Sequence, residues 1–288
     1  YSMLQAIRPV HRPDVKVVLY AYDQTEFAPE RVRLEPNLVV GLAPKTIDLA
    51  VLEPYLDAWR AMGAREFFLR PNYPWWYHTG SLPVGFEKHL GDLVKFFVRK
   101  GVTVVDIDSL MHHWPNFGLA DYVLAKTLTD PDKPFERWED EYLSAFGTAA
   151  PEARAYFAFW RSRWDAQILP NLGEILGTSC DFTRGLYRDA ARYYQVETFD
   201  QAEALLAPAA AKPLGPAERR QLDRAILSVR HAKQVFLALT SQGTEQHRQA
   251  RRLLDFRERN RDRLNFLWAN LEAAEIRYKD DAGTGRFH

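Results

Sequence analysis

Four short apolar runs, separated by amphipathic segments, constrain the fold of this chain most. Each run is rich in β-branched or aromatic residues, which favour strands. Because parallel neighbours cannot be joined by a tight hairpin, this alternation predicts parallel pairing with right-handed crossovers. The pattern fits half of an eight-fold βα barrel, or a small open α/β sheet. The four runs are residues 17–22, 37–42, 65–70 and 102–107.

Apolar residues recur at helical spacing between these runs. One such pattern extends over residues 47–59 and another over residues 86–98. Gly63 and Gly101 follow the two patterns, at the position that a helix C-terminus favours. The sequence therefore predicts two amphipathic helices as connections between strands.

The later part of the chain has a different texture. From about residue 117 onward nearly all of it shows helical spacing, with breaks near Pro208 and at residues 212–216. We expect an α/β domain over residues 1–116 and an α-helical domain over residues 117–288. The chain begins without methionine in what reads as the middle of a helix, which suggests that it is the later part of a longer protein.

Composition excludes several classes of partner. The 38 basic and 38 acidic residues give a formal net charge of zero, whereas a nucleic-acid binder normally shows a basic excess on one face. The single cysteine, Cys180, excludes an internal disulfide framework and a Cys-rich metal site. No run approaches the roughly 20 apolar residues of a membrane-spanning helix. We expect a soluble protein without nucleic-acid or membrane partners, while cytoplasmic, periplasmic and secreted locations stay open.

Polar and aromatic side chains gather directly after the predicted strands. In parallel α/β folds the ligand lies beyond the carboxyl ends of the strands, so these side chains are the candidate site residues. The best candidates for catalysis within this chain are two carboxylates, Asp23 after the first strand and Asp108 after the fourth. The candidates for substrate binding are Tyr22, Arg70, Asn72, Trp75, Trp76, His112, His113 and Asn116.

This set of side chains suits a carbohydrate. Sugar rings lie on aromatic faces, their hydroxyls need polar partners, and the guanidinium of Arg70 matches the carboxylate of an acidic sugar. Glycosidic cleavage needs an acid and a base or nucleophile, which carboxylates supply. We expect no metal, because adjacent residues such as His112 and His113 rarely both reach one ion without a third ligand in register. We also expect no cofactor, and the sequence has no Gly-rich phosphate loop.

Each candidate also has a structural alternative. Asp23 could be a turn residue after a strand, and Asn72 a turn-forming amide. Arg70 could be an ion-pair partner, and we expect Asp106 to pair with a neighbouring residue of the sheet rather than with substrate. The tryptophans could pack under a helix, and the histidines could make hydrogen bonds within their loop.

Two stretches resemble a passage of known proteins. They are residues 121–132, DYVLAKTLTDPD, and residues 140–151, DEYLSAFGTAAP. The passage reads Tyr-x-Leu-Ala-Lys-Leu-Leu-Trp-Asp-Pro, then Asp-Glu-Tyr, then Tyr-Gly-x-Ala-Ala, and follows the last barrel strand in bacterial proteins with the DUF4838 domain. This chain departs from it at Thr129, where tryptophan is usual, and at residues 106–108, Asp-Ile-Asp, which replace an ending like Phe-Glu-Gln.

The resemblance implies the second half of a (β/α)8 TIM barrel, strands five to eight, followed by an α-helical C-terminal domain. Such barrels are glycoside-hydrolase-like and akin to family 20 hexosaminidases and α-glucuronidases. Relatives include inverting exo-sialidases whose acid and base lie early in the barrel. The catalytic pair would then belong to the first half of the barrel, which is absent from this sequence.

Three functions follow as expectations. The first is an exo-acting, inverting glycoside hydrolase for a terminal acidic sugar, sialidase-like, with an α-glucuronidase or a hexosaminidase as variants. The second is a carbohydrate-binding barrel without catalysis. The third is an oligomerising protein, for instance a homodimer, in which the stripe of Phe157, Trp160 and Trp164 faces another subunit instead of the core.

Overall fold

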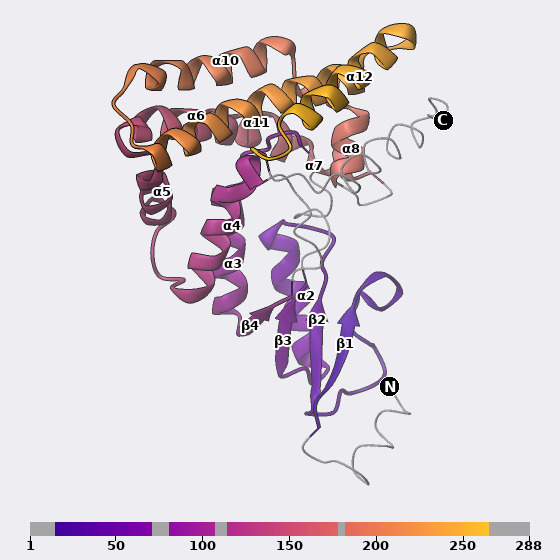
Figure 1. Ribbon diagram of the computed structural model, residues 1–288. Helices are drawn as coiled ribbons and strands as arrows, with labels where there is room; N and C mark the ends of the chain where they lie inside the picture. Colours follow the sequence, from indigo (N-terminus) through magenta and orange to yellow (C-terminus); the bar gives the residue numbers. More distant parts are fainter. Residues whose placement is uncertain (1–14, 71–80, 107–113, 178–181, 265–288) are drawn as a thin grey trace. The chain divides into compact units, whose positions relative to one another are not determined.

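The computed structural model describes residues 15–70, 81–106, 114–177 and 182–264. Over these ranges the chain is a mixed α/β protein with a small parallel sheet and a largely helical remainder (Figure 1). Its contacts divide it into two compact units, Tyr1–Tyr77 with Leu93–Leu110, and His78–Asp92 with Met111–His288. The division into folding domains at residue 116 stays a prediction, since a compact unit need not fold independently.

The first unit is built on a sheet of four strands that lie side by side in chain order (Figure 1). All three strand pairs are parallel, which confirms the pairing predicted from the alternation of strands and helices. Gly63 and Gly101 have positive φ angles of 105° and 79°, as expected for glycines that follow helices. The elements are β1 (Val17–Ala21), η1 (Asp23–Thr25), β2 (Leu38–Leu42), α2 (Leu49–Ala61), β3 (Glu66–Leu69), α3 (Glu87–Arg99) and β4 (Val102–Val105). Helix α3 is divided between the two units, because its residues up to Asp92 belong to the second unit and those from Leu93 onward to the first.

One face of the sheet is buried against α2. The hydroxyl of Tyr55 on α2 donates to the carbonyl of Ala21, and the guanidinium of Arg60 lies 5.4 Å from the ring centre of Phe67. Burying apolar side chains on this face supplies the main favourable term for the first unit. Side chains with exposures of 3% or less on this face and on α2 include Ala21, Val40, Leu42, Leu52, Leu56, Trp59, Phe67 and Leu69.

The opposite face of the sheet has a gap at Gly41. Tyr20, Gly41, Phe68 and Val104 are neighbours in the parallel register and form one row across the four strands. The rings of Tyr20 and Phe68 meet edge to face across the gap, with centroids 5.4 Å apart. A Cβ atom at Gly41 would lie 2.2 Å from Cζ of Phe68, so only glycine fits beneath this ring. We use the name open face for this side of the sheet, because Val18, Tyr20 and Val104 are 41–56% exposed there.

The second unit is helical. The longest helix, α11, contacts α12, α10, η2, α4 and α9 and forms its centre. The predicted breaks near Pro208 and at residues 212–216 are confirmed, because η5 and a non-helical link separate α10 from α11. The elements are α4 (Trp114–Thr129), α5 (Phe135–Leu143), η2 (Ser144–Ala149), α6 (Ala150–Arg163), the π-helical turn η3 (Trp164–Ile168), η4 (Leu169–Asn171), α7 (Leu172–Leu176), α8 (Phe182–Arg188), α9 (Ala190–Tyr193), α10 (Val196–Leu206), η5 (Ala207–Ala211), α11 (Pro216–Thr240) and α12 (Gly243–Arg259).

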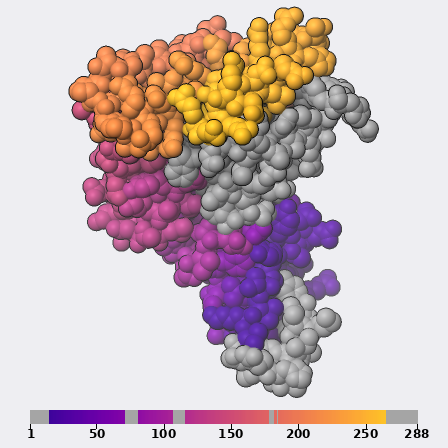
Figure 2. All heavy atoms as spheres, in the orientation of Figure 1, coloured from indigo at the N-terminus to yellow at the C-terminus, as the bar shows by residue number. Residues whose placement is uncertain are grey.

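Two sets of helical side chains differ in burial. Phe157, Trp160 and Trp164 are all less than 5% exposed, so this stripe is core and does not support the oligomerising alternative. The arginine-rich run of α12 lies largely at the surface, as the yellow atoms in Figure 2 show. Arg257 is buried instead, because it is 2% exposed and its Nε donates to Nε2 of His231 at 3.0 Å.

A buried ion network joins the start of α3 to α5 and α6 within the second unit. Arg161 reaches Oε1 of Glu87 at 3.0 Å and Oε1 of Glu139 at 2.6 Å, and Arg154 contacts the other oxygen of Glu139 at 2.6 Å. Glu87 and Glu139 are only 5% and 4% exposed. Burial raises the pKa of the Glu87 carboxyl above its ordinary value, although the charge of Arg161 acts in the opposite direction.

We expect Gly41→Ala to lower the free energy of unfolding by about 1–3 kcal/mol, because the added methyl group displaces the Phe68 ring. The matched control is Gly173→Ala on α7, where a Cβ atom meets no atom within 4 Å. That control should be neutral or stabilising by up to about 1 kcal/mol, since alanine is the better helix former. Denaturant unfolding followed by circular dichroism compares them, and equal midpoints would refute the packing argument.

We expect Glu87→Gln to change how stability depends on pH. With a raised pKa the folded chain holds the Glu87 proton more tightly than the unfolded chain, so this group's contribution is full at low pH. The contribution is lost as the pH rises through the folded-state pKa, with a slope of at most about 1.4 kcal/mol per pH unit. The Gln variant lacks this loss, so its stability relative to wild type should increase with pH. Parallel stability curves from acidic to neutral pH would contradict the raised pKa.

Candidate functional site

The candidate site is the carboxyl edge of the sheet, by which we mean the residues at and shortly after the carboxyl ends of β1 to β4. Tyr22 and Asp23 follow β1, Lys45 lies shortly after β2, Arg70 follows β3, and Asp106 follows β4. Because all four strands are parallel, these side chains share one edge of the same sheet. This is the edge at which ligands bind in parallel α/β folds.

Arg70 is held at this edge by Asp106 and Tyr20. Its Nη1 atom lies 2.7 Å from Oδ2 of Asp106, and its guanidinium carbon lies 5.3 Å from the ring centre of Tyr20. The Tyr20 hydroxyl also approaches Oδ2 of Asp106, at 3.4 Å. Side-chain exposures of 24% for Arg70 and 45% for Asp106 leave the pair accessible from solvent. The expected pairing of Asp106 with a residue of the sheet is confirmed, and Arg70 does act as an ion-pair partner.

The turn after β1 places Asp23 in an unusual backbone conformation. Its φ angle is 51°, and among the described residues it is the only non-glycine with positive φ. Thr25 closes the turn, because its hydroxyl donates to the carbonyls of Tyr20 and Tyr22 at 2.9 Å. Lys45 contacts the carboxylates of both Asp23 and Glu26 at 3.5 Å. A left-handed conformation costs about 1–2 kcal/mol for a residue with a side chain, and such strain concentrates at functional sites.

The remaining predicted residues have different outcomes. Asn116 belongs to the second unit, where its Nδ2 donates to the carbonyl of Ser81 at 2.7 Å and its Oδ1 accepts from the hydroxyl of Ser228. These contacts give Asn116 a positioning role for the segment at Ser81, and its contact with a sugar stays a prediction. The candidates that lie outside the described residues are Asn72, Trp75, Trp76, Asp108, His112 and His113.

The carboxyl edge includes two residues that the sequence analysis did not select as site residues. Tyr20 lies within β1, and nothing in its local sequence distinguishes it from the apolar residues around it. Lys45 stands in a sequence stretch with few polar side chains, so its contact with Asp23 shows only in the folded chain. Across the described ranges, no group of three or more His, Cys, Asp or Glu side chains could hold a metal ion. The helices in these ranges are also too short or too polar to cross a membrane.

The passage that carries the sequence resemblance is a clamp between α4 and α5. The Tyr122 hydroxyl donates to Oε1 of Glu141 at 2.6 Å, and Lys126 binds the same oxygen. Lys126 also lies over the rings of Tyr122 and Trp138, at 5.3 and 5.4 Å from their centres. Its hydrogen bond lowers the pKa of the Glu141 carboxyl. The residues of this motif therefore bind one another, which explains their spacing without a catalytic role.

Comparison with known proteins finds the same family that the stretches at residues 121–132 and 140–151 resemble. A family model described as "Domain of unknown function (DUF4838)" matches residues 4–158. This range includes the whole sheet and both helices of the clamp. Neither the curated proteins nor the solved structures contain a match to the chain.

Two substitutions at Asp23 test the backbone strain. Both Asp23→Gly and Asp23→Ala remove the carboxylate near Lys45, so the difference between them reports the backbone alone. We expect the Gly variant to be more stable than the Ala variant by about 1 kcal/mol, because glycine adopts positive φ without a steric penalty. Thermal unfolding of the two variants measures this difference. An alanine variant as stable as the glycine variant would show that the turn relaxes to negative φ.

Proposed function

Since the chain belongs to the DUF4838 family, we propose that its sheet is the second half of a glycoside-hydrolase-like (β/α)8 barrel. In this proposal β1 to β4 occupy the places of strands five to eight. The family match and the sequence resemblance cover this sheet and the helical clamp that follows it. The parallel order of the strands is compatible with such a barrel, and an open α/β sheet is the alternative.

The open face of the sheet supports the barrel. Parallel sheets are normally covered on both faces, yet Val18, Tyr20 and Val104 are 54%, 41% and 56% exposed. In a closed barrel one face of every strand packs against helices, as the buried face does here through α2, while the other points inward. Four further strands would cover the open face and bury these side chains.

We infer that the carboxyl edge binds the terminal acidic sugar of a glycoside, and that the complete barrel hydrolyses it as an exo-acting, inverting enzyme. The fixed position of Arg70 is the observation that carries this proposal. Asp106 and the ring of Tyr20 orient the guanidinium at the edge where ligands of such folds bind. A guanidinium carries five N–H donors in a planar fork, a geometry that matches a sugar carboxylate.

The chemistry requires two groups on opposite sides of the glycosidic bond. Inversion places an acid and a base about 6.5–9.5 Å apart, with a water molecule between the base and the sugar. Asp23 is the candidate at the described part of the edge, and its carboxylate is 67% exposed. The sequence resemblance assigns the principal acid and base to earlier barrel strands. This half would therefore supply the wall that recognises the sugar.

A second candidate function, carbohydrate binding without hydrolysis, also has a specific observation in its favour. Asp106 is engaged with Arg70, and Asp23 is largely exposed near Lys45. Neither carboxylate lies in the buried, apolar surroundings in which a glycosidase acid typically sits. The described edge by itself is thus suited to recognition more than to proton transfer.

The first experiment measures fluorophore release by the full-length protein from aryl glycosides, among them a sialoside, a glucuronide and an N-acetylglucosaminide. We expect hydrolysis of an acidic glycoside. Arg70→Ala should lower kcat/KM for it by about 30-fold or more, the equivalent of about 2 kcal/mol for a lost charged contact. For a neutral glycoside the loss should be much smaller.

The matched control is Arg230→Ala, which removes an exposed arginine from its ion pair with Glu203 on helices of the second unit. This control should keep wild-type kcat/KM. A folded Arg70→Ala variant with unchanged kcat/KM on the acidic glycoside would refute the carboxylate contact. If no glycoside is hydrolysed but the free sugars bind saturably, the result would favour a carbohydrate-binding protein over a hydrolase.

A further inference from the structure

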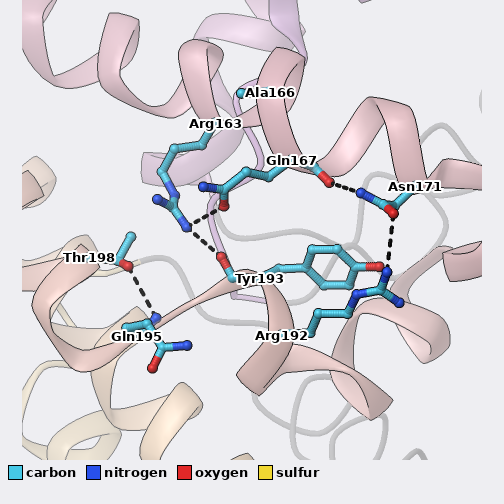
Figure 3. A pocket seen from close by; sticks show the side chains of 8 residues that line it. All are labelled: Arg163, Ala166, Gln167, Asn171, Arg192, Tyr193, Gln195 and Thr198. Atoms are coloured by element: carbon cyan, nitrogen blue, oxygen red, sulfur yellow. Dashed lines mark hydrogen bonds between the residues drawn. The ribbon is translucent and has the colours of Figure 1, made fainter.

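A polar pocket lies within the second unit, away from the residues of the carboxyl edge in the chain. It has a volume of about 330 Å³ and lies among η3, η4, α9 and the start of α10 (Figure 3). This volume falls at the lower end of the range of small-molecule sites, about 300–1,000 Å³. The lining includes Arg163, Gln167, Asn171, Arg192 and Tyr193, and no carboxylate. A small ligand that carries negative charge is the natural match for such a lining.

The π-helical turn η3 shapes one wall of the pocket. It spans Trp164–Ile168, and the N–H of Leu169 donates to the carbonyl of Trp164, five residues earlier. Trp164 and Ile168 are 3% and 2% exposed and anchor the turn in the core. The turn places Arg163 and Gln167 side by side, with Nη2 of the arginine 2.7 Å from Oε1 of the glutamine. Single π turns are rare and occur frequently at functional sites.

The charge of Arg163 is not balanced within the pocket. Its Nη2 donates to Gln167 and to the carbonyl of Tyr193 at 2.5 Å, and both acceptors are uncharged. No carboxylate of the described residues pairs with it, whereas Arg192 on the other side pairs with Glu174. Burial also lowers the pKa of the Arg163 guanidinium below its ordinary value. A bound anion would supply the missing counter-charge.

Tyr193 contributes a second polar group to the pocket, a hydroxyl without a hydrogen-bond partner among the described residues. The residue is 3% exposed, and its buried hydroxyl makes no hydrogen bond to any described residue. In Figure 3 its ring extends across the pocket, with the hydroxyl toward the side chains of Asn171 and Arg192. A buried hydroxyl without a partner destabilises the fold, so such groups call for an explanation. Hydroxyl groups of a ligand, reached when the exposed Arg192 side chain moves, would provide one.

We propose that this pocket binds a small carboxylate that also bears hydroxyl groups, of about the size of one sugar acid. The carboxylate lies against Arg163, and the hydroxyls bond to the side chains of Gln167, Asn171 and Tyr193. This site is independent of the carboxyl edge and of the hydrolase proposed there. The competing explanation is that Arg163 only caps the C-terminal end of α9 by binding the carbonyl of Tyr193.

Isothermal titration of the full-length protein with D-glucuronate, D-glucose and inorganic phosphate tests the proposal. We expect saturable binding of glucuronate, and binding at least tenfold weaker for glucose and for phosphate. Arg163→Gln, which keeps an amide donor but removes the charge, should weaken glucuronate binding at least tenfold. Arg230→Gln should bind as wild type does, since it removes an exposed arginine that is not part of the pocket lining. D-glucuronate could also bind at the carboxyl edge proposed above, so the titration is repeated in an Arg70→Ala background. Binding at the pocket should persist in that background, and adding Arg163→Gln to it should remove the binding.

Tyr193→Phe separates a ligand-binding role from a structural one. It should weaken glucuronate binding several-fold without lowering the melting temperature of the free protein, because the deleted hydroxyl has no partner to lose. Unchanged affinity in a folded Arg163→Gln variant would overturn the proposal. Equal affinity for phosphate and glucuronate would overturn the carboxylate assignment. Absence of any saturable binding, with Arg163→Gln merely less stable, would establish the helix cap instead.

Discussion

The edge-to-face contact of Tyr20 and Phe68 across Gly41 is the interaction on which the carboxyl edge depends. The two rings meet over β2 because Gly41 has no side chain there, and a Cβ atom at Gly41 would collide with the Phe68 ring. The same Tyr20 ring lies under the guanidinium of Arg70, and its hydroxyl approaches Asp106. The Tyr20 ring therefore contacts both Phe68, over the glycine in the middle of the sheet, and the charged pair at the end of the sheet.

Charges are handled differently in the two units. At the carboxyl edge the cations are accompanied by carboxylates, Arg70 by Asp106 and Lys45 by Asp23 and Glu26. These contacts are partly exposed and add little stability, so their main effect is on orientation. In the second unit Glu87 and Glu139 are almost completely buried and share Arg161. Removing one member of such a network costs far more than removing a surface pair, because a buried charge is left behind.

In this protein, the residues that carry the family resemblance are not the residues suited to bind a ligand. Within the motif by which the chain resembles its family, Tyr122 and Lys126 on α4 form hydrogen bonds to Glu141 on α5. These contacts hold the two helices together. The groups suited to a ligand lie elsewhere, after the strands and beside the π turn. A family signature can therefore report a structural clamp, while function has to be argued from each site.

The sequence by itself determined the order of the four strands and of the two helices between them, the approximate bounds of these elements, the parallel pairing and the helical character of the later part. These properties follow from local periodicity and from the positions of glycine and proline, which act over a few residues. It also indicated that Asp106 pairs within the sheet. Only the tertiary structure decided that the partner is Arg70, 36 residues away, that Arg257 is buried against His231, and that Arg163 and Tyr193 meet in one pocket. Contacts between distant segments depend on packing, register and burial, and no local pattern in the chain encodes them.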